Sequence, residues 1–195
     1  KAVDFFGLLP GHTIEQADAD QAYTQALMGE ETDAGVAETP CKVSVTTWVR
    51  LPPECRPSSW RGMRDPVVPL EKALYGHPDA GGYWEKHCDS HLKKVGFRLA
   101  SPNWPSIYYH EELQLLLMVY VDDFKMSGPA GKNMARGWAL IKEGLALDTP
   151  GPVGRCLGCH HVLRQATVGQ QPVNVIEYHV TDFMKDCVTA YKKAC

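Results

Sequence analysis

Two adjacent carboxylates directly follow an apolar stretch of the sequence. Residues 115–121 read Leu-Leu-Leu-Met-Val-Tyr-Val, which is typical of a buried strand, and Asp122 and Asp123 come next, before the chain turns apolar again. Two anionic side chains beside a buried strand are costly unless a cation meets them. Because hard oxygen ligands on a rigid hairpin suit Mg²⁺, this pair is the first candidate for metal chemistry. The competing interpretation is a plain turn, where aspartate is common.

A second acidic segment lies near the start of the chain and reads Asp18-Ala-Asp-Gln-Ala-Tyr23. Together with Tyr120-Val-Asp-Asp123 it resembles the palm of reverse transcriptases. In that family one catalytic aspartate opens a D-x-x-x-A-Y/F segment and two more come from a Y-x-D-D hairpin.

A third segment narrows the resemblance. Residues 70–84 read L-E-K-A-L-Y-G-H-P-D-A-G-G-Y-W and are similar to the L-x-K-A-L-Y-G-x-x-x-A-x-x-x-W signature of copia-type LTR retrotransposon reverse transcriptases. Smaller likenesses follow in the family's order at residues 47–53, at residues 91–97 and at Leu157-Gly158. The resemblance spans roughly residues 14 to 163, and ordered agreement of this kind is more specific than any single motif.

The resemblance implies an RNA-directed DNA polymerase that transfers a nucleotide to a primer 3′-hydroxyl. Two Mg²⁺ ions, or Mn²⁺ in their place, would clamp the attacking and departing oxygens. In the family's arrangement Asp18 and Asp122 are the bridging metal ligands and Asp123 assists. The implied partners are an RNA or DNA primer-template and a deoxynucleoside triphosphate.

The resemblance also implies a nucleotide-binding set. Tyr23 would lie under the sugar of the incoming nucleotide, and Tyr75 and Gly76 would line the nucleotide side. An ordinary core aromatic is the alternative for Tyr23. Asp20 is the less suitable ligand, since the spacing to the tyrosine favours Asp18. Lys125 is expected to be solvated, with a contact to primer or nucleotide as the alternative.

Several departures favour a second interpretation. The family's basic fingers do not fit in the 17 residues before Asp18, and the segment after Gly76 reads His77-Pro-Asp-Ala-Gly81 where the family has cations. The net charge of −3 is also unusual for a protein that binds phosphates. The alternative to an active enzyme is therefore a catalytically inactive, co-opted fragment that acts as a structural or interaction subunit of a larger complex.

Cysteine and histidine residues raise two further metal hypotheses. Residues 156–161 read Cys-Leu-Gly-Cys-His-His, which matches the C-x-x-C-H pattern of c-type haem and could also begin a zinc site with His179 or Cys187. Both are weaker than the polymerase hypothesis. A second cluster has metal-like helical spacing, but core packing is the better expectation for it. It comprises His87, Cys88 and His91.

The overall composition indicates a single, possibly incomplete, domain of 195 residues. No apolar run approaches the ~20 residues of a membrane span, and the first ten residues do not resemble a secretory signal. The seven irregularly spaced cysteines favour reduced thiols. We therefore expect an intracellular protein, in a cytoplasmic particle or in the nucleus, without a membrane span.

The expected fold class is α+β: a polymerase palm with an antiparallel sheet, helices on one face and a ferredoxin-like core, with fingers and thumb incomplete. Residues 1–165 would form the palm, and residues 166–195 a final strand and helix that begin the thumb. Strands are expected at residues 13–18, 43–51, 106–109, 113–121, 124–127, 155–163 and 173–180. Helices are expected after residue 18, as one turn at 70–74, and at 80–95, 133–147 and 182–195, with loops at 29–39 and 57–69.

Overall fold

The computed structural model describes residues 1–28 and 46–194. The loop expected at residues 29–39 and the start of the strand expected at 43–51 lie outside the described residues. The chain divides into two compact units. The first contains residues 1–20 and 91–195, and the second contains residues 21–90.

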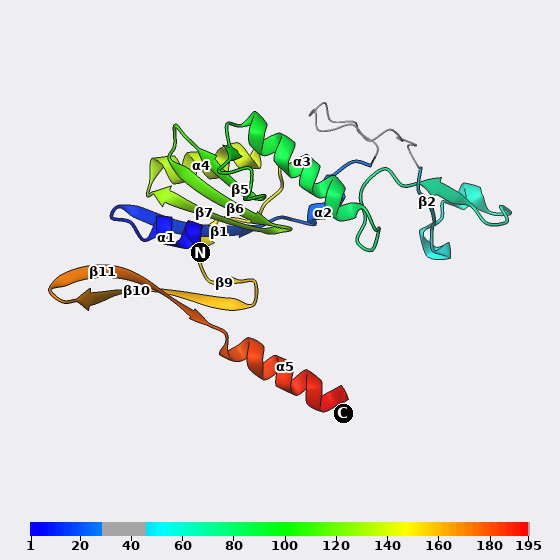
Figure 1. Cartoon of the computed structure of the whole chain (residues 1–195). Coiled ribbons are helices and arrows are strands. Elements are labelled where there is room, and N and C mark those ends of the chain that lie inside the picture. The colour runs from blue at the N-terminus through cyan, green and yellow to red at the C-terminus, as the bar shows by residue number, and fades with distance from the viewer. Residues whose placement is uncertain (29–45, 195) are drawn as a thin grey trace. The chain divides into compact units, whose positions relative to one another are not determined.

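A six-stranded antiparallel sheet forms the centre of the first unit, in the order β4-β5-β6-β7-β1-β8 (Figure 1). Burial alternates along the continuously apolar central strand β6, which buries Leu115, Leu117 and Val119. This period of two is what a strand with one face on a core requires. The strands are β1 (His12–Asp18), β4 (Arg98–Leu99), β5 (Ile107–His110), β6 (Leu115–Tyr120), β7 (Asp123–Pro129) and β8 (Gly151–Pro152).

Helix α4 (Lys132–Lys142) packs on the apolar face of this sheet. Its Gly137 lies so close to Leu115 and Met126 that an added Cβ would come within 2.3 Å of the leucine side chain. The absence of a side chain there lets helix and sheet approach, and the buried apolar contact forms the core. The helix expected at residues 133–147 is present but ends at Lys142.

The opposite face of the sheet is covered by α1 (Ala2–Gly7), where Gly7 meets Ile14 and Ser127. The expectation that helices lie on one face is therefore wrong for this short helix. The physical reason is a buried lysine on this face, described below, whose charge partner is carried by α1.

A second, three-stranded sheet follows in the order β11-β10-β9, and α5 ends the described chain (Figure 1). The strand expected at residues 155–163 is broken by a turn at Leu157 and Gly158, both with positive φ, and β10 continues beyond it. The closing strands and terminal helix are otherwise confirmed. Their bounds are β9 (Arg155–Cys156), β10 (Cys159–Val168), β11 (Gln171–His179) and α5 (Thr181–Ala194). The expected domain boundary after residue 165 falls within β10.

The second unit holds short elements around a small alanine-rich cluster that buries Ala26, Ala73 and Ala80. The helical turn expected at residues 70–74 is wrong: Ala73 donates its backbone N–H to the carbonyl of Ala26 at 2.9 Å, and Met28 donates to Glu71. Hydrogen bonds between these two segments satisfy the backbone N–H and C=O groups better than an isolated helical turn would. The loop expected at 57–69 contains two short elements. The unit holds α2 (Ala22–Gln25), β2 (Trp48–Arg50), the 3-10 turns Pro53–Cys55 and Ser58–Trp60, and β3 (Val67–Pro69).

Helix α3 (Ala80–Lys94) continues from the second unit into the first and confirms the amphipathic helix expected at residues 80–95. Trp84, Cys88 and Leu92 lie buried on one face of it. Gly96, with a φ of +98°, follows the end of the helix in a conformation that strains L-residues other than glycine. Taken element by element, the chain is a mixed α+β protein with antiparallel sheets.

Within residues 1–28 and 46–194, every helix is too short or too polar to cross a membrane.

Candidate functional site

Asp18 and Asp123 lie directly opposite each other on neighbouring strands β1 and β7. Residues directly opposite in an antiparallel pair direct their side chains to the same face, so the two carboxylates are brought together. Asp123 is also opposite Tyr120 on the strand at its other side. Two of the three sequence-predicted aspartates are therefore brought together on the central strands of the first unit.

Asp122 occupies the turn between β6 and β7. Val121, which precedes it, has a φ of +55°, and the Asp122 carbonyl accepts a hydrogen bond from the backbone N–H of Ala19 at 2.8 Å. The turn is thus tied to the end of β1 by its backbone. The aspartate directly opposite Asp18 is Asp123, whereas the family's arrangement gives the bridging role to Asp122.

The carboxyl group of Asp123 shows the electrostatic cost of this arrangement. Burial raises its pKa, and the charges of Asp18 and Asp122 and a side-chain hydrogen bond to Asp18 raise it further, while Lys125 opposes them. Like charges at close range favour the protonated acid. A divalent cation would offset the same repulsion, so the Asp18–Asp123 pair fits a metal by its donor chemistry.

Asp122 does not join Asp18 and Asp123 in a three-ligand metal-binding group in this structure. Within the described part of the chain, no set of three or more His, Cys, Asp or Glu side chains is arranged to hold a metal ion. The pair is therefore the part of the predicted metal site that the geometry brings together.

Lys125 lies on the same face of β7 as Asp123, two residues further on, and is only 4% exposed. The expectation of a solvated lysine is therefore wrong. Its Nζ donates to Oδ1 of Asp4 at 3.0 Å and to Nε2 of His161 at 3.3 Å. A buried ammonium requires such partners, because removal from water is expensive.

The partners of Lys125 are themselves fixed by further hydrogen bonds. Tyr178 donates its hydroxyl to the other carboxylate oxygen of Asp4 at 2.9 Å. Burial raises the pKa of Asp4, but its bonds to Lys125 and Tyr178 outweigh burial and lower that pKa overall. Burial and the bond to Asp4 raise the pKa of Tyr178 to about 12. Helix α1, strand β7 and the β10–β11 hairpin are thereby joined beside the aspartate pair.

The imidazole of His161 completes this network in its neutral form. Its Nδ1 lies 3.2 Å from the Gly154 carbonyl and 3.1 Å from the Cys159 carbonyl, so Nδ1 carries the proton and Nε2 accepts from Lys125. Burial and the adjacent Lys125 charge lower the pKa of His161. We refer to Asp4, Lys125, His161 and Tyr178 as the buried polar network.

Gln16 on β1 holds strand β9 against the face of the six-stranded sheet that carries Asp18 and Asp123. Its side-chain amide donates to the Arg155 carbonyl at 3.1 Å and accepts from the Gly154 N–H at 3.0 Å. Because Gln16 and Asp18 are two residues apart on β1, they share one face. The start of the second sheet is therefore held beside the aspartates.

The predicted nucleotide-binding residues lie in the second unit. The rings of Tyr23 and Tyr75 are in contact, with centroids 4.6 Å apart and planes tilted by 43°, and Tyr75 is 54% exposed. Gly76 has a φ of +93° and open space around its Cα. These three residues are thus grouped with each other, while Asp18, Asp122 and Asp123 belong to the first unit.

The cluster on α3 that has metal-like spacing makes other contacts. His91 places Nε2 2.9 Å from the Ile141 carbonyl and 3.1 Å from that of Leu140, where it caps the end of α4. Cys88 is buried, and burial followed by the charges of Asp89 and Glu85 raises its thiol pKa to about 12. Cys88 thus packs in the core as expected, while His91 is engaged by backbone carbonyls of α4.

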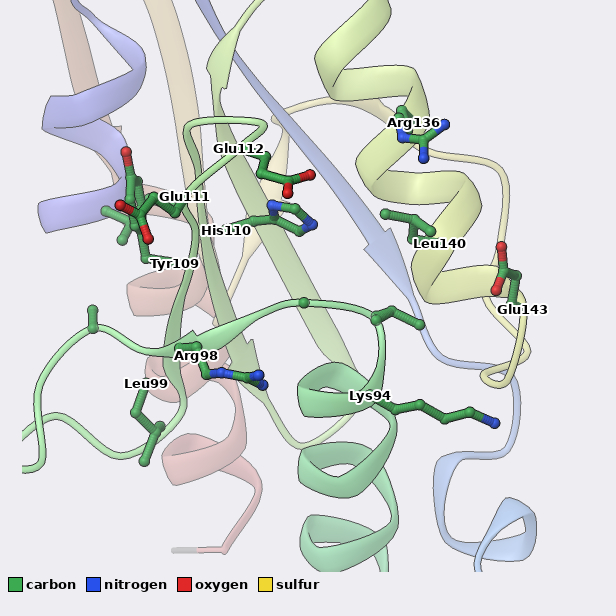
Figure 2. Close-up of a pocket in the computed structure, with 14 residues that line it drawn as sticks. Lys94, Arg98, Leu99, Tyr109, His110, Glu111, Glu112, Arg136, Leu140 and Glu143 are labelled. Carbon is green, nitrogen blue, oxygen red and sulfur yellow. The ribbon is translucent and has the colours of Figure 1, made fainter.

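A separate pocket of about 850 Å³ lies in the first unit, bounded by the end of α3, by β4 and β5, and by α4 (Figure 2). Its wall mixes cations and carboxylates, among them Lys94, Arg136, Glu112 and Glu143. The buried His110 accepts the N–H of Leu113 at Nδ1 and packs edge-on against Phe97. None of the sequence-predicted site residues lines this pocket.

Sequence reasoning missed Asp4 and Tyr178, which join the site from opposite ends of the chain. Nothing in their local sequence marks them. For Lys125 a signal exists, because the period of two in β7 places it on the face of Asp123.

Comparisons with known proteins identify no relative of this chain. No family model matches the chain, and neither does a curated protein or a solved structure.

Proposed function

We propose that this chain is the palm part of an RNA-directed DNA polymerase of the copia-type retrotransposon class, which transfers nucleotides to a primer 3′-hydroxyl. The observation that carries the proposal is the register that sets Asp18 opposite Asp123 at the ends of two central strands. The two aspartates lie 105 positions apart in the sequence, yet both come from segments that resemble the catalytic motifs of the family.

In this proposal Asp18, Asp122 and Asp123 hold Mg²⁺, which would neutralise charge on the reacting phosphate and activate the attacking hydroxyl. The protein's own part is to present carboxylates from a rigid sheet, so that little reorganisation is needed on binding. The raised pKa of Asp123 supports this role, because repulsion stored between carboxylates is relieved by a cation. Tyr23 and Tyr75 would contribute aromatic surface for the nucleotide.

The second candidate is a catalytically inactive palm that serves as a structural or interaction subunit. One observation favours it: among the described residues, no three ligands form a group that could hold a metal. The use of Lys125 inside the protein points the same way, since this cation is engaged by Asp4 and His161 rather than free for a phosphate.

The deciding experiment is extension of a primed RNA template by the chain in Mg²⁺ or Mn²⁺. Asp18→Asn and Asp123→Asn are expected to abolish extension, because each removes a carboxylate from the opposed pair. Asp20→Asn is the matched control, since this exposed aspartate lies in the same segment and keeps activity if the ligand is Asp18.

Metal binding is measured in parallel by thermal unfolding with and without Mg²⁺. Extension that survives both substitutions would refute the polymerase proposal. A folded chain that neither extends a primer nor gains stability from Mg²⁺ would establish the second candidate instead.

A further inference from the structure

Cys156 and Cys159 face each other across the turn that joins β9 and β10. They are direct register partners, and only Leu157 and Gly158 separate them. Both turn residues have positive φ, +50° and +74°, as in the tight hairpin turns that match the twist of paired strands. The Cα atoms of opposed antiparallel residues are about 4.5–5.5 Å apart. Disulfides require about 4.4–6.8 Å, so this register already satisfies that condition.

We propose that Cys156 and Cys159 form a redox-active dithiol site, which closes to an intramolecular disulfide with a low-molecular-weight disulfide such as glutathione disulfide as oxidant. Both thiols are free in this structure. The proposal goes beyond the polymerase function and does not rest on it.

The two thiols have different roles in the reaction because their exposure differs. Cys156 is 4% exposed, and burial raises its thiol pKa, whereas Cys159 is half-buried and reachable. The Cys159 thiolate attacks a sulfur of the oxidant, releases one thiol and forms a mixed disulfide. Cys156 then loses its proton, attacks the Cys159 sulfur and displaces the second thiol. Two protein thiols are oxidised to one disulfide, and the oxidant is reduced to two thiols.

The hairpin provides the proximity that favours this closure over a lasting mixed disulfide. Strand β9 is held by both hydrogen bonds to Gln16, and the N–H of His161 donates to the Gly154 carbonyl at 2.9 Å. These contacts keep the strands paired around the turn. A partner held in place reacts as an intramolecular group, at a far higher effective concentration than free thiol.

The other described cysteines lack this arrangement. Cys88 is buried, with its thiol pKa raised by burial and nearby acids. Cys55 lies exposed at the end of the 3-10 turn Pro53–Cys55 in the second unit, and Cys187 lies exposed on α5. Among residues 1–28 and 46–194, the opposed pair at the β9–β10 turn is thus the cysteine pair that strand register brings together.

The sequence supplies a direct assay for the disulfide. Trypsin cleaves after Arg155 and Arg164, and the peptide 156–164 contains Cys156 and Cys159 but no other cysteine. The full chain is equilibrated in glutathione buffers of increasing disulfide content, quenched with an alkylating reagent and digested. We expect this peptide to lose two hydrogens and to escape alkylation as the buffer becomes oxidising.

Three comparisons make the result decisive. Cys156→Ser should leave Cys159 carrying one glutathione, and Cys187→Ser should leave the disulfide in place. Repeating the equilibration in urea should reduce the disulfide yield about tenfold relative to glutathione adducts, because the strands no longer hold the thiols together.

The proposal is overturned if peptide 156–164 stays a dithiol in oxidising buffer or accumulates two glutathiones. It is equally overturned if Cys159 pairs with Cys187 instead, or if unfolded and folded chains close the disulfide to the same extent.

Discussion

Lys125 on β7 and Asp4 on α1 form an ion pair of 3.0 Å in which the two side chains are only 5% and 3% exposed. The residues are 121 positions apart, so the contact exists only in the folded chain. It closes the polar face of the sheet directly beside Asp123.

Removing one partner of the buried pair should be strongly destabilising. Lys125→Met leaves Asp4 charged and buried, and we expect a loss of about 3–5 kcal/mol in the free energy of unfolding, measured by urea denaturation. The control is Lys185→Met, which breaks the exposed Lys185–Asp182 pair and should cost less than about 1 kcal/mol. Equal losses in the two variants would show that the buried pair has no special role.

Stability should fall as the pH drops below the ordinary pKa of histidine. The folded-state pKa of His161 is lowered by burial and by Lys125, so below about pH 6.5 the unfolded chain takes up a proton that the folded chain resists. Stability is therefore complete above that pH and is lost on acidification toward the lowered pKa. His161→Gln should flatten the profile in urea titrations, and an unchanged slope in this variant would contradict the role of His161.

Asp123→Asn should stabilise the metal-free chain. The raised pKa of Asp123 means that its charge opposes folding at neutral pH, a penalty that disappears as the pH falls through that pKa. For like charges directly opposite on paired strands we expect a gain of about 0.2–1 kcal/mol. Thermal unfolding without Mg²⁺ measures it, and Asp122→Asn, at the exposed turn, should gain less. A loss of stability in Asp123→Asn would contradict the repulsion.

A methyl group at Gly137 should disrupt the contact between α4 and the sheet. The added Cβ would lie 2.3 Å from Leu115 Cδ1 and 3.1 Å from Met126 Cε, and overpacking of this kind costs about 1–3 kcal/mol. Gly82→Ala in α3 meets nothing within 4 Å and should gain up to about 1 kcal/mol from helix propensity. Denaturant midpoints of the two variants are expected to move in opposite directions, and a neutral Gly137→Ala would show that the helix shifts freely.

Local sequence determined much of the secondary structure. The amphipathic pattern of α3 and its glycine cap, the continuous apolar run of β6 and the acidic turn after it are all readable from residue pattern and turn chemistry. The helical turn expected at residues 70–74 failed, because pairing with residues 26–28 outweighed a weak local preference.

The proposed catalytic aspartates also follow from the sequence, since their motifs are local. Which aspartate faces Asp18 does not, because register depends on how β1 and β7 align, and there Asp123 is the partner. The same holds for the dithiol: the C-x-x-C spacing is visible in the chain, but only the turn at Leu157 and Gly158 sets the two cysteines face to face.

The buried polar network was decided by tertiary structure alone. Lys125 appears in the sequence as an ordinary basic residue after two aspartates, yet folding surrounds it with groups from residues 4, 161 and 178. A buried ammonium is tolerated only where such partners converge, and their convergence depends on long-range packing rather than on neighbouring residues.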